Sequence, residues 1–193
     1  THRYTLFPYT TLFRSSDEAL IGFDEAMTRK PQIPALLSDG KMRNNVAELV
    51  EKLLREKAGS QARFSINIEK VFEIDLDKDG INEIFIEASA PEGEDYTADY
   101  TYDPVLLYDV AILSSSDLNE YQVFESSYTV CKEEADLCFY KMEGFEFQSF
   151  TDFNGDGILE VFIRTFYYEG GGLDIFEYRN GALTKVLTGG CGL

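Results

Sequence analysis

The sequence predicts a mainly β fold with helices at its N-terminal end, an α+β arrangement with antiparallel strands. Three observations predict it. Hydrophobic residues recur at helical spacing before Gly59 and at a spacing of two residues after it. Beyond Gly59, short apolar segments alternate with polar turns, which is typical of sheets built from hairpins. One stretch of this second part is repeated after 77 residues, from Asp75 to Asp152.

The start of the chain is set apart from the rest. Residues 5–15 (TLFPYTTLFRS) resemble a translated short-read sequencing adapter. We therefore interpret residues 1–15 as an artefactual leader and leave them out of the fold prediction. The alternative is a genuine apolar N-terminal strand. If these residues are a leader, we expect the natural N-terminus to be missing, together with any signal peptide.

Residues 16–60 are predicted to form a helical segment. A first amphipathic helix is expected at residues 16–27, and two prolines end it. A second helix is expected at residues 42–57, where Gly59 ends it. Its apolar positions share one face: Met42, Val46, Leu49, Val50, Leu53 and Leu54. We expect this stripe to pack on a sheet.

Residues 61–193 are predicted to form one β-rich domain. A half-buried first strand is indicated by alternating apolar residues, namely Phe64, Ile66, Ile68, Phe72 and Ile74. Further strands are expected at residues 81–88, 105–113, 121–130, 137–142, 145–150, 158–168, 173–178 and 183–187. Asn180-Gly181 predicts a hairpin turn between the last two. The acidic, Tyr-rich residues 91–103 are interpreted as a solvated insertion, with a binding surface as the alternative.

The repeated stretch is an Asp-rich loop that runs into an apolar strand. Residues 75–86 and 152–163 are identical at seven of twelve positions. Oxygen ligands at loop positions 1, 3, 5, 7 and 9 suit a hard cation such as Ca²⁺, and Gly at position 6 permits the sharp turn. The candidate ligands of the first loop are Asp75, Asp77, Asp79, Ile81 and Glu83. Those of the second loop are Asp152, Asn154, Asp156, Ile158 and Glu160, and both isoleucines contribute a backbone carbonyl.

The sequence favours two other interpretations of these loops less. The first is a pair of Asp-Gly turns with incidental acids, which the duplicated spacing disfavours. The second is an EF-hand-like pair in an intracellular calcium sensor. An EF-hand needs a bidentate Glu at position 12, where this chain has Ile86 and Ile163, and it needs flanking helices where this chain predicts strands.

The pattern Asp-x-Asp-x-Asp-Gly-x-x-Glu between two strands resembles the FG-GAP or VCBS-type repeat of integrin-α-like β-propellers. The resemblance implies that calcium braces antiparallel, blade-like sheets through the ligands named above. A closed propeller usually needs about four to eight blades, so two repeats cannot close a ring. We therefore expect either a piece of a longer protein or a partial, open β-propeller-like form capped by the helix at residues 42–57.

Composition excludes several classes of function. The net charge of −18 argues against nucleic acid or an anionic membrane surface as partner. No stretch reaches the about 18 apolar residues of a membrane span, so no membrane insertion is expected. The only histidine, His2, lies in the leader, which argues against His-based triads and zinc sites. Cys131 and Cys138 flank a predicted hairpin and form either a disulfide or two reduced thiols.

These features together predict a non-enzymatic, calcium-binding β-rich domain. We expect two structural Ca²⁺ sites, of which the first is tighter because it offers four carboxylates against three. Calcium is scarce in the cytosol, so a secreted or extracytoplasmic location is favoured, with a role in binding or surface display. An unidentified protein or glycan would be its ligand. The alternative is a hydrolase that works with two carboxylates, for which no pair stands out.

Overall fold

The structure is a computed structural model that describes residues 34, 36–37, 40–59, 62–90, 104–131, 143–167 and 169–192. Residues 31–193 form one compact unit. The predicted leader, the helix expected at residues 16–27, the insertion at 91–103 and the strand expected at 137–142 lie outside the described residues. Those four predictions therefore stay predictions.

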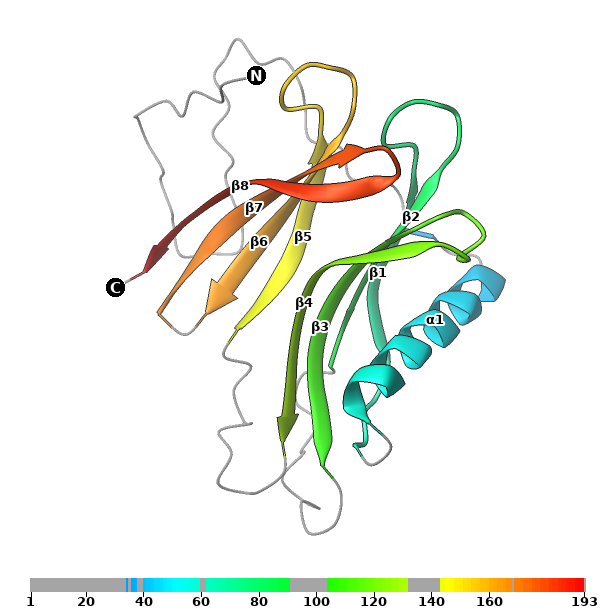
Figure 1. Ribbon diagram of the computed structural model, residues 1–193, viewed down its shortest axis with the longest axis vertical. Helices are drawn as coiled ribbons and strands as arrows, with labels where there is room; N and C mark the ends of the chain where they lie inside the picture. Colours follow the sequence, from blue (N-terminus) through cyan, green and yellow to red (C-terminus); the bar gives the residue numbers. More distant parts are fainter. Residues whose placement is uncertain are drawn as a thin grey trace. The chain divides into compact units, whose positions relative to one another are not determined.

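The described part of the chain contains one helix and two antiparallel four-stranded sheets (Figure 1). The elements are α1 (Gly40–Ala58), β1 (Asn67–Ile74), β2 (Glu83–Ser89), β3 (Val105–Ser114), β4 (Tyr121–Cys131), β5 (Glu143–Thr151), β6 (Glu160–Tyr167), β7 (Gly170–Arg179) and β8 (Ala182–Gly192). The first sheet has the order β1-β2-β3-β4 and the second β5-β6-β7-β8. The predicted mainly β, antiparallel class is confirmed, and neither sheet of the described residues closes into a barrel.

The two sheets are copies of one plan. In each, four strands follow one another as a meander, and an Asp-rich loop joins the first strand to the second. In each, the register of the first pair shifts by one residue, between Ile68 and Lys70 in β1 and between Phe147 and Ser149 in β5. The repeat seen in the sequence is therefore a repeat of a whole sheet, and it includes the strand that precedes each loop.

Helix α1 covers the outer face of the first sheet (Figure 1). Its buried residues are Val46, Leu49, Val50, Leu53 and Leu54, five of the six positions of the predicted stripe. They pack against Val71, Ile84 and Ile86 of β1 and β2. The sixth, Met42, is partly buried against the same cluster. Gly59 follows the helix with φ +71°, a conformation that glycine adopts without strain. The second predicted helix and its packing on a sheet are confirmed.

The sheets stack head to tail. On β2, Ile84 and Ile86 face α1, whereas Phe85 faces the second sheet. Their equivalents on β6, 77 residues later, are Val161, Ile163 and Phe162. Val161 and Ile163 face the first sheet. Phe162 is buried but belongs to neither of the two apolar clusters formed by described residues. The face of the first sheet that points away from α1 thus packs against the second sheet. The face that it meets there corresponds to the α1-covered face of the first sheet, so this is a heterologous contact between unlike surfaces.

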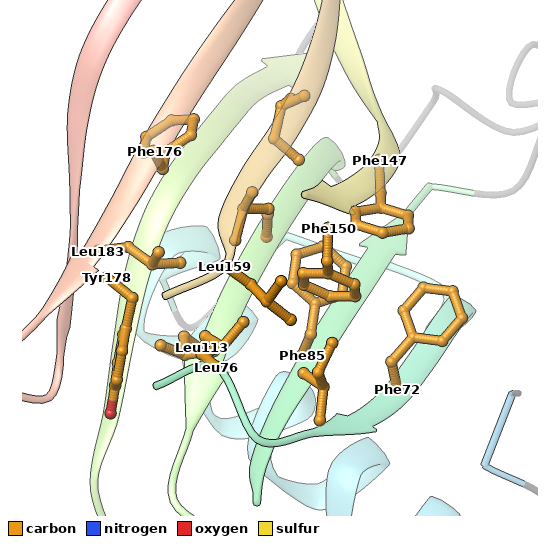
Figure 2. Close-up of a cluster of buried hydrophobic side chains, with 14 of the residues drawn as sticks. Phe72, Leu76, Phe85, Leu113, Phe147, Phe150, Leu159, Phe176, Tyr178 and Leu183 are labelled. Carbon is orange, nitrogen blue, oxygen red and sulfur yellow. The ribbon is translucent and has the colours of Figure 1, made fainter. Parts of the chain in front are cut away.

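A dense aromatic core lies between the sheets (Figure 2). The ring centroids of Phe85 and Phe147 are 4.8 Å apart, and those of Phe147 and Phe150 are 4.6 Å apart. Phe85 and Phe150 meet edge to face at 5.6 Å, a favourable arrangement for aromatic rings. Leu76 and Leu159 belong to the same cluster. The core therefore extends into both Asp-rich loops.

The first strand departs from its predicted alternation. Phe64 and Ile66 precede β1 and pack with the cluster beneath α1, as does Ile68. The register shift after Ile68 then turns Phe72 toward the second sheet. A single alternating apolar face was therefore the wrong expectation, because a β-bulge exchanges the two faces of a strand.

Strand β3 has little exposed surface. It is buried along almost its whole length, because α1 covers one of its faces and the second sheet covers the other.

The predicted hairpin turn is confirmed. Asn180 and Gly181 have φ of 54° and 79°, and they join Arg179 to its partner Ala182, as a tight two-residue hairpin requires.

Candidate metal centre

The first loop (residues 75–83) and the second loop (residues 152–160) have positive φ at the same two positions. At position 4, Lys78 has φ 62° and Gly155 has φ 88°. At position 6, Gly80 has φ 89° and Gly157 has φ 95°, which is why glycine suits that position in both copies. Two separate stretches of sequence therefore form loops with the same turns at positions 4 and 6.

Matching hydrogen bonds hold both loops. The position-7 N–H donates to the position-5 aspartate, from Ile81 to Asp79 at 2.7 Å and from Ile158 to Asp156 at 3.0 Å. The position-5 N–H donates to the position-3 side chain, at 3.3 Å in the first loop and 2.8 Å in the second. These bonds turn the side-chain oxygens into each loop, as local Asx turns do.

The first loop brings three carboxylates together. One oxygen each of Asp75, Asp77 and Asp79 lies within 4.8 Å of the other two, a spacing that could hold a metal ion. Asp75 accepts from the N–H groups of Asp79 and Gly80, at 3.1 and 2.9 Å. Three crowded negative charges repel one another, and a divalent cation replaces that repulsion with attraction. Glu83, the fourth predicted side-chain ligand, lies outside this group.

The second loop is more loosely arranged. In the part of the chain that the structure describes, its acids form no comparable group of three. Asp156 lies 3.5 Å from the guanidinium of Arg179, which also pairs with Glu177 at 2.7 Å. The Asn154 amide donates to Asp156 and to Glu177, at 3.2 and 3.3 Å. A built-in cation and an amide therefore already engage the acids that an ion would attract.

The position-9 glutamates brace their loops alike but differ in their second oxygen. Oε2 of Glu83 accepts the N–H of Leu76 at 3.0 Å, and Oε2 of Glu160 accepts the N–H of Phe153 at 2.6 Å. Oε1 of Glu83 also accepts the hydroxyl of Tyr178, from β7, at 3.0 Å. Among the described residues, Oε1 of Glu160 is buried without a hydrogen-bond partner.

Burial shifts the acidity of both glutamates. It raises the pKa of Glu83, while the bonds from Leu76 and Tyr178 oppose the rise. Burial raises the pKa of Glu160 to about 7, and the charges of Asp156 and Asp152 add to the effect. A buried carboxylate without a second hydrogen bond is costly to ionise, and a cation beside it would remove that cost.

Several site residues lie outside the sequence motif. Tyr178 and Arg179 are on β7, and no spacing rule connects them to the loops. Their only signal in the sequence is the Asn180-Gly181 turn beside them, which predicts a hairpin but not its neighbours. Of the two carbonyl positions, Ile81 is exposed, whereas Ile158 packs against the apolar core.

Two of the three cysteines lie among the described residues. Cys131 is buried at the end of β4 and is disulfide-bonded, whereas Cys191 is exposed and free. Cys138, the partner proposed from the sequence, lies outside the described residues. Disulfides persist mainly in oxidising compartments.

No protein-family model, curated protein or solved structure matches this chain. The two loops and their surroundings therefore carry the functional interpretation.

Proposed function

We propose that this protein is a calcium-binding, non-enzymatic domain whose two Asp-rich loops hold structural Ca²⁺ ions. The carboxylates of Asp75, Asp77 and Asp79, with oxygens within 4.8 Å of one another, carry the proposal. Oxygen-only ligands on a tight loop suit Ca²⁺, which takes six to eight oxygens at about 2.3–2.6 Å. Asp152, Asn154, Asp156 and Glu160 would form the second site.

The ions would act on stability. Each loop joins the first two strands of its sheet, and Leu76 and Leu159 anchor the loops in the core between the sheets. Ion binding to a folded loop then becomes folding free energy. At free calcium about tenfold above the Kd, each site adds about 1.4 kcal/mol, a useful share of a total of ~5–15 kcal/mol.

The sheet architecture supports a β-propeller-like organisation of the FG-GAP or VCBS kind. Both repeats are four-stranded meanders with the loop at the same place, and they stack head to tail. Helix α1 covers the front of the first sheet, where a preceding blade would lie in a propeller. Both loops are flanked by strands, which disfavours an EF-hand switch, because its flanking helices are the parts that move.

A binding role is favoured over hydrolysis by two of the three buried acids that lie away from the loops in the described part of the chain, Glu87 and Asp174. Glu87 is paired with Lys70 at 3.2 Å and accepts the N–H of Phe147 at 2.8 Å. Asp174 is paired with Lys185 at 2.7 Å. Each acid thus forms an ion pair within its own sheet, and Glu87 also accepts a hydrogen bond from the other sheet. The ligand would be an extracytoplasmic protein or glycan.

The central experiment is thermal unfolding in calcium, in magnesium and in chelator. We expect calcium to raise the Tm of the intact chain and magnesium to raise it much less, since Mg²⁺ demands a stricter octahedral site. Asp75→Ala should reduce the calcium shift, and Lys41→Ala, on helix α1, should leave it unchanged. An intact chain with equal Tm in calcium and chelator would refute calcium binding at these loops.

The extracytoplasmic location has its own measurement. The free thiols of the unfolded, non-reduced protein can be counted with a chromogenic disulfide reagent. We expect one reactive thiol, that of Cys191, of the three cysteines in the chain. Three reactive thiols in protein secreted through an oxidising compartment would contradict the disulfide at Cys131 and remove this support.

A further inference from the structure

The two loops touch each other directly. The N–H of Leu159 in the second loop donates to the C=O of Leu76 in the first, at 2.8 Å. Both side chains are buried in the one core between the sheets (Figure 2). Lys78 of the first loop also lies near the second loop. Its Nζ is 3.8 Å from the position that a Cβ atom on Gly157 would occupy. Two loops separated by 77 residues in sequence are therefore neighbours in space.

The contact involves the residues that position the ligands. The peptide N–H of Leu76 is held by Glu83 of the first loop, while its C=O is held by Leu159 of the second. A second connection runs through β7. Tyr178 donates to Glu83, and its neighbour Glu177 accepts from Asn154. One strand of the second sheet thus contacts candidate ligands of both loops.

The second loop carries a separate sign that a cation belongs there. Oε1 of Glu160 is buried, and among the described residues it has no hydrogen-bond partner. Glu160 is only 1% exposed, and its other oxygen, Oε2, accepts the N–H of Phe153, the neighbour of Asp152, at 2.6 Å. A buried carboxylate oxygen without a partner is costly unless a cation meets it.

We propose that the two loops bind calcium cooperatively, through the Leu76–Leu159 backbone bond and the Tyr178–Glu83 bond. The proposal rests on the proposed function, since it requires that both loops bind the ion. An ion in the first loop orders Asp75 to Glu83, and with them the carbonyl to which the second loop is attached. The second ion then binds a loop that is already partly ordered, which reduces its entropic cost. Coupling of this kind is reciprocal and typically changes affinity about 5- to 150-fold.

The coupling is measured by calorimetric titration of calcium into the intact chain and two single-loop variants. Asp75→Ala leaves only the second site, and Asp152→Ala leaves only the first. We expect the remaining site of each variant to bind calcium at least about fivefold more weakly than the same site does in the intact chain. If both remaining sites keep their affinities, the coupling is refuted and calcium binding stands. If the intact chain binds no calcium, the proposed function fails as well.

Tyr178→Phe tests the path itself, because it removes the hydroxyl and keeps the ring in the core. We expect both sites still to bind calcium. The affinity of each site should then depend much less on whether the other site is occupied. The matched control is Tyr108→Phe. Its buried hydroxyl donates to the carbonyl of Ser65 at 2.9 Å, in the cluster beneath α1, and contacts neither loop. Equal coupling in both tyrosine variants would exclude Tyr178 from the path. The single-loop comparison decides the proposal even where Tyr178→Phe does not fold.

Discussion

The first and second loops turn at the same two positions but differ in their surroundings. Both have positive φ at positions 4 and 6, and both brace the position-2 N–H with the position-9 glutamate. The first loop lies against the second sheet, so Glu83 gains the hydroxyl of Tyr178. Glu160 has no such partner among the described residues, and its pKa rises to about 7. The motif thus sets where each loop turns, while the position of the loop between or outside the sheets sets the acidity of its candidate ligands.

Head-to-tail stacking explains the difference. Heterologous packing gives two copies of one unit unlike neighbours. Leu76, at position 2 of the first loop, is fully buried between the sheets, whereas Phe153, at the same position of the second, is only half-buried and meets Phe162 at 6.0 Å. Residues at the same position of the two loops therefore contribute differently to the stability of the fold.

The largest expected effect sharpens that contrast. Leu76→Ala, measured by urea unfolding in chelator, should cost about 2–5 kcal/mol, because it leaves a cavity in the core between the sheets. Phe153→Ala should cost less, since its ring is partly solvated in the folded protein. Ile81→Ala is the control, because its side chain is 61% exposed and should change stability by less than about 0.5 kcal/mol. Equal losses at Leu76 and Phe153 would mean that the loops are packed alike.

The next effect concerns calcium affinity. Asp75→Ala should lower the calcium affinity of the first loop, the tighter site, and Asp152→Ala that of the second loop, the weaker site. Each affinity should fall by about a hundredfold or more, since even the loss of a residue that only supports a metal ligand costs about 10–100-fold in affinity. The first loop offers four carboxylates and the second three, one of which is engaged by Arg179. Calorimetric titration of both variants measures the order. A tighter second loop would show that the unpartnered oxygen of Glu160 outweighs the difference in charge.

A third prediction concerns pH. The pKa of Glu160 is raised from 4.5 to about 7, so the folded chain holds this proton more tightly than the unfolded chain does. Without metal, the stability from Glu160 is complete below about pH 4.5 and is lost as pH rises through 7, by at most about 1.4 kcal/mol per pH unit. In chelator, Glu160→Gln should therefore gain stability relative to the unmodified protein between pH 5 and 7.

Urea unfolding at several pH values measures that difference. Glu56→Gln, at an exposed position of α1, is the control and should follow the unmodified protein at every pH. Saturating calcium should reduce the difference, because the ion stabilises the ionised carboxylate. Parallel pH profiles for the Glu160 variant and the unmodified protein would show that this carboxyl is not strained in the folded chain.

The smallest effect tests the built-in cation of the second loop. Arg179→Leu removes a positive charge 3.5 Å from Asp156 and should raise the calcium affinity of the second loop by up to about fivefold, the scale of an exposed ion pair. Arg164→Leu, at an exposed position of β6, removes the same charge outside the loop and should have a smaller effect. Equal gains in both variants would assign the effect to net charge alone.

Local signals in the sequence predicted most of the described secondary structure. The apolar stripe of α1, the stop at Gly59 and the Asn180-Gly181 turn act within one turn or one hairpin, so they are visible without the fold. The loop repeat and its ligand spacing are local too, and the three aspartates of the first loop lie together as its turn requires. The bulge after Ile68 is not visible in the sequence pattern, because a register shift is set by the partner strand.

The sequence by itself determined two copies of one loop-and-meander unit, because backbone conformation and hydrophobic periodicity depend on neighbouring residues. Only the tertiary structure decided what each copy meets. It placed Tyr178 beside Glu83, 95 residues away, and joined Leu159 to Leu76. It also left Oε1 of Glu160 buried without a partner among the described residues. These differences arise from packing between elements far apart in the chain, where burial and charge are set by contacts that no local pattern encodes.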